Sequence, residues 1–84
     1  MKIIYTKHAE EKLQRQDFKK FKINKTLIRK IINNPYTKTK TKYGDFAVIG
    51  RVDSNHILRI IYVIINSSNK VITFHIARKG RYEN

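Results

Sequence analysis

The chain has 84 residues, no cysteine, and 19 Lys and Arg against 6 Asp and Glu, a formal net charge of +13. A chain of this length predicts one small domain over residues 1–84, and the missing cysteines exclude disulfides and thiolate metal sites. This composition suits a reducing cytoplasm, and the excess of cations predicts a phosphate-rich partner, first of all nucleic acid. The longest apolar run, residues 60–65, is too short to cross a bilayer, so no membrane partner is expected.

The N-terminal residues predict a short strand followed directly by a helix. Residues 3–5 are apolar and aromatic, Thr6 is a good helix N-cap, and residues 7–17 carry a helical spacing of apolar positions. His8 falls in the first turn, where the positive end of the helix dipole favours a neutral imidazole. A packing or capping role is the simpler interpretation of His8.

A basic connector, residues 18–23, leads to a second predicted helix over residues 25–33. Asn24 can cap this helix, and Pro35 ends it because the residue before a proline is pushed away from helical backbone angles. The apolar side chains recur on one stripe, which is typical of a core-facing helix: Leu27, Ile28, Ile31 and Ile32.

Residues 37–42 alternate Thr and Lys, so that Lys38, Lys40 and Lys42 lie on one side if the backbone is extended. These lysines suit a comb of phosphate contacts. They equally suit an edge strand, where lysines hinder association with other sheets, or a loop.

Three strands are predicted in the C-terminal half, over residues 46–52, 56–65 and 71–78, joined as an antiparallel meander. The strand at 56–65 is apolar on both faces except at Arg59, so we expect it to be central. Together with the N-terminal strand and the two helices, this predicts an α+β fold.

The period-2 pattern also predicts which face each side chain occupies. We expect these residues to point inward: Phe46, Val48, Val52, Leu58, Ile60, Ile64, Ile72, Phe74 and Ile76. Arg51, Arg59 and His75 then share the other face, with Arg51 opposite or nearly opposite Arg59. Ala77 neighbours Arg59 in this scheme, with His75 one step along.

Like charges on opposed strands destabilise a sheet, so Arg51 and Arg59 favour a bound phosphate or a carboxylate from a partner. The alternative is that both side chains extend past aliphatic neighbours into solvent. Two helices cannot cover both faces of the sheet, so part of the apolar second face is expected to form a binding groove.

Cations and a phenol follow the end of the last strand: Arg78, Lys79, Arg81 and Tyr82. An imidazole at His75 beside these groups suits phosphate chemistry. His56 adjoins a turn and is expected to be a surface residue.

The order strand–helix–helix–meander resembles the RelE/ParE-like toxin superfamily. The segments Tyr5-Thr6-Lys7-His8-Ala9 and Ile76-Ala77-Arg78-Lys79-Gly80-Arg81-Tyr82-Glu83 are similar to the BrnT-like branch and related small uncharacterised domains. The resemblance implies a RelE-like fold and the toxin of a toxin–antitoxin pair, which cleaves RNA, often messenger RNA on the ribosome, and is neutralised by a cognate antitoxin. By position, Arg59, Arg78 and Tyr82 match phosphate-binding and phenolic residues of the superfamily, and His8 matches its His-Ala motif.

Metal-free RNA cleavage needs a proton acceptor for the 2′-hydroxyl, cations for the phosphorane and a proton donor for the leaving oxygen. The candidate catalytic residues are His8, Arg59, His75, Arg78 and Tyr82, and the candidate RNA contacts are Lys38, Lys40, Lys42, Arg51, Lys79 and Arg81. No metal or other cofactor is expected, since the carboxylates are scattered along the chain. A non-catalytic RNA- or DNA-binding module and an interaction domain for an acidic partner are the open alternatives.

Overall fold

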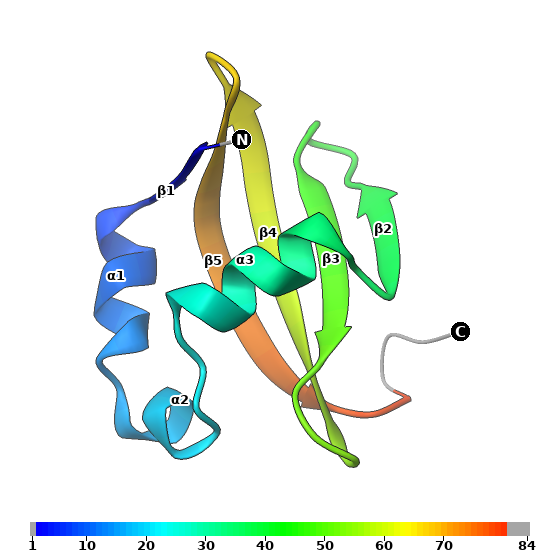
Figure 1. Ribbon diagram of the computed structural model, residues 1–84. Coiled ribbons are helices and arrows are strands. Elements are labelled where there is room, and N and C mark those ends of the chain that lie inside the picture. Colours follow the sequence, from blue (N-terminus) through cyan, green and yellow to red (C-terminus); the bar gives the residue numbers. More distant parts are fainter. Residues whose placement is uncertain (1, 81–84) are drawn as a thin grey trace.

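A five-stranded mixed sheet organises the fold in the computed structural model, which describes residues 2–80 (Figure 1). The elements, in chain order, are β1 (Lys2–Tyr5), α1 (Lys7–Leu13), α2 (Gln16–Lys20), α3 (Lys25–Asn33), β2 (Thr37–Lys40), β3 (Phe46–Arg51), β4 (His56–Ile65) and β5 (Ser68–Arg78). The strand order is β1-β5-β4-β3-β2, with β1 parallel to β5 and all other neighbours antiparallel.

The sequence predicts the α+β class, the N-terminal strand and the central position of β4 correctly, but the sheet has five strands in mixed pairing rather than the predicted N-terminal strand and three-stranded antiparallel meander. The segment at Thr37–Lys40 pairs with β3 as an edge strand, and β1 pairs with β5 at the other edge. The additional strand β2 follows from local pattern, because alternating Thr and Lys suits a strand with one free edge. Residues Thr37–Lys40 therefore form an edge strand rather than a loop.

The N-terminal helix is shorter than predicted. Instead of one helix over residues 7–17, α1 ends at Leu13, and Arg15 has an extended backbone before α2 begins. This break turns Phe18 into the core, where its ring meets Phe74 edge-on with centroids 5.0 Å apart. The predicted N-caps are confirmed, because Thr6 Oγ1 accepts from the Ala9 N–H and Asn24 Oδ1 accepts from the Leu27 N–H.

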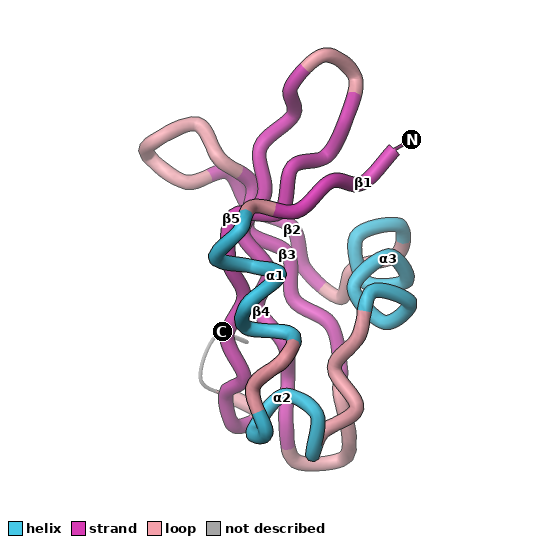
Figure 2. Tube along the Cα trace, turned by 90° about the vertical axis from the view of Figure 1, so that its left-hand side faces the viewer, coloured by secondary structure: helices cyan, strands magenta, loops and turns pink. Residues whose placement is uncertain are grey.

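One face of the sheet carries the hydrophobic core. The buried cluster joins the helices to the strands through Ala9, Leu13, Phe18, Ile23, Ile28, Ile31, Ile32, Val48, Leu58, Ile60, Tyr62, Val71 and Phe74. Viewed along the sheet, α3 stands to one side of the strands (Figure 2). The apolar stripe predicted for α3 is thus confirmed as core.

The sheet pairing between β4 and β5 contains a bulge that changes the predicted facing. A tight turn at Asn66 and Ser67, both with positive φ, joins the strands, and the register then shifts between Ile61 and Tyr62. Val71, rather than Ile72, pairs with Tyr62 and enters the core. The inward position predicted for Ile72 is therefore wrong. Ile64 keeps the parity of Tyr62 on β4 but lies beyond the core and is 46% exposed, so its predicted burial is wrong as well.

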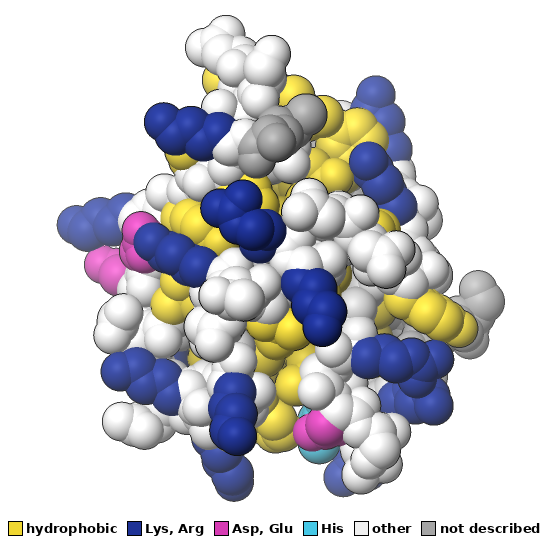
Figure 3. Space-filling view, in the orientation of Figure 1, with side chains coloured by type: hydrophobic (Ala, Val, Ile, Leu, Met, Phe, Trp, Pro, Cys, Tyr) yellow, Lys and Arg dark blue, Asp and Glu magenta, His cyan; other side chains and the backbone are white. Residues whose placement is uncertain are grey.

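Lys and Arg side chains are distributed over the helix-covered face, whereas acidic side chains are confined to a few places (Figure 3). Among residues 2–80, no helix has the length and apolar character needed to cross a membrane.

Candidate functional site

Arg59 and His75 lie directly opposite each other on β4 and β5. The sequence predicts their shared face, but the register differs from the expected one. Arg51 pairs with Ile57, not with Arg59, because the Val52 N–H bonds to the His56 carbonyl and so fixes the hairpin. On the other side, Arg59 neighbours His75 itself rather than Ala77. The structure therefore puts an arginine and a histidine directly opposite each other and offsets the two arginines diagonally by two residues.

Helix α1 lies along the edge of β5 beyond the end of β1. The ladder between β1 and β5 stops at Tyr5 and Val71, where the Thr6 N–H bonds to the Val71 carbonyl at 3.1 Å. The Thr6 hydroxyl then donates to the Ile72 carbonyl at 3.0 Å. A helix thus replaces a strand as the neighbour of β5, and its side chains reach the face that carries His75.

Lys12 is a buried cation of this helix, only 8% exposed. Its ammonium donates to Thr73 Oγ1 at 3.1 Å and to the Phe74 carbonyl, so it satisfies an acceptor on the free edge of β5. The rings of Phe18 and Phe74 flank it at 5.4 and 5.5 Å. Burial, reinforced by the charge of Arg15 and opposed by Asp17, lowers the pKa of Lys12.

Sequence reasoning missed Lys12, because a lysine on an amphipathic helix is normally solvated. One signal was present: Lys12 stands four residues after His8, and residues at this spacing share a helix face.

His8, Lys12, Arg59 and His75 gather around β5, and we refer to these four residues as the His75 cluster. His75 is exposed at the surface, yet partial burial, then the charges of Lys12, Arg59 and His8, lower its pKa below the ordinary 6.5. The side chain is therefore mainly neutral at pH 7, as a proton acceptor must be. His8 is exposed and Arg59 is half-buried, so a ligand has access to both.

Arg78 and Lys79 lie apart from the His75 cluster, at the end of β5. Arg78 pairs with His56, three residues past His75, and strand alternation puts it on the opposite face. A cavity of about 400 Å³ lies there, lined by Ser54, Asn55, His56, Arg78 and Lys79. His56 also contacts the Phe21 ring and pairs with Asp53 at 3.0 Å, in line with its expected surface position.

Asp53 completes the turn beside that cavity. The Asn55 backbone N–H, followed by the His56 side chain, lowers the pKa of the Asp53 carboxyl. The predicted grouping of Arg78 with His75 is thus replaced by two separate groups, and the predicted residues Arg81 and Tyr82 lie outside the described residues.

Lys38, Lys40 and Lys42 are exposed, as predicted. Lys38 and Lys40 pair with Val48 and Phe46, so they lie on the helix side of edge strand β2. The Lys38 ammonium sits 4.8 Å from the Phe46 ring centroid. The lysines therefore form a basic edge that is separate from the His75 cluster.

The face of the sheet opposite the helices is less exposed to solvent than expected. Ala47, Ile49 and Ile57 lie on it and are at most 5% exposed, so the apolar groove predicted there is not found at these residues. The larger exposed apolar side chains are Tyr36, Tyr43, Ile64 and Ile65.

Between residues 2 and 80, no group of three or more His, Asp or Glu side chains is arranged to hold a metal ion. Comparisons with protein-family models, with curated proteins and with solved structures gave no match.

Proposed function

We propose that this chain is a metal-independent endoribonuclease with the His75 cluster as its active site. The proposal includes the role implied by the RelE/BrnT-like resemblance, a cytoplasmic toxin that cleaves messenger RNA and is neutralised by a cognate antitoxin. The observation that carries it is the gathering of two imidazoles, an arginine and a buried lysine around one strand. These groups match the requirements of 2′-hydroxyl transesterification.

In the proposed reaction, neutral His75 accepts the proton of the ribose 2′-hydroxyl as O2′ attacks the adjacent phosphorus. The guanidinium of Arg59, opposite His75, binds two phosphate oxygens and stabilises the charge of the phosphorane. His8 gives a proton to the departing O5′. The P–O5′ bond breaks, and the products are a 2′,3′-cyclic phosphate and a 5′-hydroxyl.

Lys12 acts through its charge rather than by contact with the substrate, because it is buried and already bonded to Thr73 and Phe74. Its positive field lowers the pKa of His75, which keeps the imidazole ready to accept a proton. In this proposal Lys12 is a positioning residue.

The surplus of cations supports RNA as the substrate. The net charge of +13 favours phosphate binding through counterion release, and the basic edge of β2 offers contacts that do not depend on sequence. Arg78 and Lys79 are further candidate contacts for the strand beyond the cleaved bond.

The test is cleavage of a defined single-stranded RNA by purified protein in the presence of EDTA. We expect 2′,3′-cyclic phosphate ends and no cleavage of the same sequence made of 2′-deoxynucleotides. Arg59→Ala should lower kcat/KM about a hundred- to a thousandfold, as loss of a transition-state donor typically does. Arg29→Ala, which removes an exposed arginine from α3, is the matched control and should cleave normally.

Two results would contradict the proposal. One is equal activity in Arg59→Ala and Arg29→Ala. The other is tight binding of RNA by the parent protein without cleavage, with or without ribosomes, which favours a non-catalytic binding module.

A further inference from the structure

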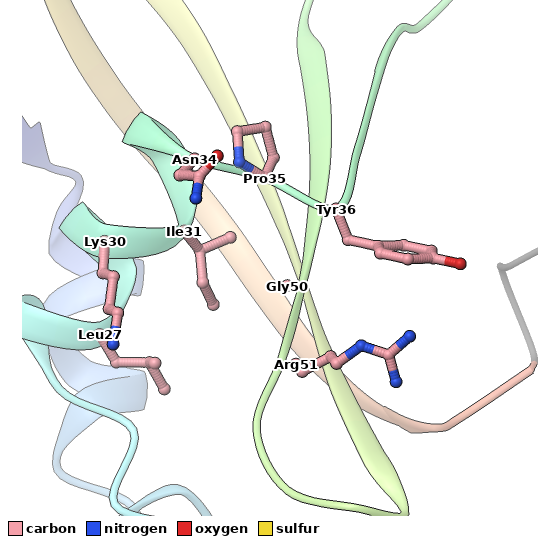
Figure 4. A pocket seen from close by; sticks show the side chains of 8 residues that line it. All are labelled: Leu27, Lys30, Ile31, Asn34, Pro35, Tyr36, Gly50 and Arg51. Carbon is pink, nitrogen blue, oxygen red and sulfur yellow. The ribbon is translucent and has the colours of Figure 1, made fainter.

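A second concave site lies between α3 and the end of β3, on the helix side of the sheet (Figure 4). Its volume is about 340 Å³, near the lower end of the range for small-ligand pockets. Leu27 and Ile31 of α3 and Gly50 of β3 provide an apolar lining. A Cβ atom at Gly50 would lie 2.4 Å from Ile31 Cγ1, so glycine is what allows the helix to approach the strand here.

Polar groups surround this apolar lining. Tyr36 and Arg51 extend in the same direction, away from α3, with the guanidinium carbon 4.9 Å from the ring centroid (Figure 4). The ring is held by a cation–π contact, yet Tyr36 stays 54% exposed. Lys30 of α3 and Asn34, just after that helix, stand on the opposite side. The site thus combines an aromatic face, an amide and two cations.

Its position connects it with the His75 cluster. Strand β2 begins at Thr37, opposite Ile49, so Arg51 lies past the end of the β2 ladder, where β3 is locally the edge of the sheet. Ile49 pairs with Arg59, and Arg51 is two residues further along the same face. From standard strand dimensions, the Cα atoms of Arg51 and Arg59 are roughly 8 Å apart.

We infer that this pocket binds one nucleotide of the RNA strand close to the cleaved phosphate. The base stacks on the Tyr36 ring at the mouth of the pocket, and Arg51, whose guanidinium lies beside that ring, binds the phosphate. Arg51 belongs to both regions, because its β3 position shares a face with Arg59 while its guanidinium covers the Tyr36 ring. The inference rests on the proposed function for its substrate, RNA, and extends it by a binding subsite.

The experiment is an NMR titration of the full chain, labelled with ¹⁵N, with adenosine or uridine 5′-monophosphate. Ribose 5-phosphate serves as the probe without a base. We expect shifts centred on Asn34, Tyr36, Gly50 and Arg51, and weaker binding of ribose 5-phosphate by roughly 5- to 150-fold, the usual effect of one stacked base.

The variants separate stacking from simple charge attraction. Tyr36→Ala should lose this difference between nucleotide and ribose 5-phosphate, whereas Tyr36→Phe should keep it, because stacking needs the ring and not the hydroxyl. Tyr43→Ala is the matched control, since Tyr43 is 79% exposed and also contacts a cation, Lys42, but lies outside the pocket. It should bind like the parent.

Equal binding of ribose 5-phosphate and the nucleotides, or shifts spread over the lysines of β2, would overturn the inference and leave an unspecific anion surface. Unchanged binding in Tyr36→Ala would overturn it as well. The titration involves no cleavage, so its result stands apart from the nuclease assay and can fail or succeed independently of it.

Discussion

The two faces of the sheet hold their side chains in different ways. On the helix-covered face, apolar side chains such as Ile28, Ile31 and Phe74 are packed together and almost fully buried. On the second face, Arg59 and His75 are positioned by strand register and by neighbouring charges. Folding and the proposed chemistry therefore depend on largely separate residues, and substitutions should divide into two classes accordingly.

Lys12 is the residue that connects the two regions. Its ammonium lies beside the core rings of Phe18 and Phe74 and also bonds to Thr73, which shares the face of His75. A change at Lys12 is therefore expected to affect both packing and the ionisation of the site.

The largest effect is expected on the packed face. Ile31→Asp introduces a charge without a partner at a position that is 4% exposed, so the protein should be unfolded at 25 °C. Circular dichroism and thermal melting measure this. Thr26→Asp, on the exposed side of the same helix, is the control and should melt close to the parent. A cooperative melt of Ile31→Asp near the parental temperature would contradict the conclusion that the helix-covered face of the sheet maintains the fold.

A smaller effect is expected at the basic edge. Replacing Lys38, Lys40 and Lys42 together by Gln should leave the melt unchanged, because all three side chains are exposed. The salt dependence of single-stranded RNA binding should become shallower, with a log–log slope reduced by about 2 for three lost phosphate contacts. Fluorescence anisotropy across a salt series measures it. An unchanged slope would mean that RNA does not follow this edge.

The smallest effect is expected from Lys12→Met. Loss of the buried charge should raise the pKa of His75, so that more of the imidazole is protonated in mild acid. We expect kcat/KM to fall about three- to tenfold at pH 6 and to change little at pH 8. Lys20→Met removes an exposed charge from α2 and should have neither effect. An equal loss at both pH values would indicate a purely structural role.

Much of the fold follows from local sequence pattern. The caps at Thr6 and Asn24, the stripe of α3 and the span of β4 are each encoded within a few residues. The bulge beside Tyr62 was not predictable in this way, because period-2 alternation assumes a regular ladder. The break after Leu13 depends on a distant contact, that of Phe18 with Phe74.

The site was predictable in part. Alternation alone puts Arg59 and His75 on one face, since each strand keeps its parity when the register changes by two residues. The same alternation puts Arg78, three residues after His75 on one strand, on the opposite face, so the predicted grouping of these two residues overlooked the parity of the strand. Lys12 was missed because its burial results from α1 lying along the free edge of β5, which is a tertiary arrangement.

The most direct test of the account is the pH dependence of RNA cleavage by the parent and by His75→Gln, in EDTA. The lowered pKa of His75 means that the imidazole becomes neutral as pH rises through a value below 6.5. Parental kcat/KM should therefore rise with pH through an acidic limb below pH 6.5. Protonation also opposes folding, so the contribution of His75 to parental stability, present above pH 6.5, should be lost as pH falls through the lowered pKa.

His75→Gln should cleave at least a hundredfold more slowly, as loss of a general base typically costs about 10² to 10⁴ in rate, and its profile should lack that limb. Its melting temperature should also fall less than the parental one on acidification. A His75→Gln variant with parental activity, or with the same acidic limb, would contradict the assignment of His75 as the proton acceptor.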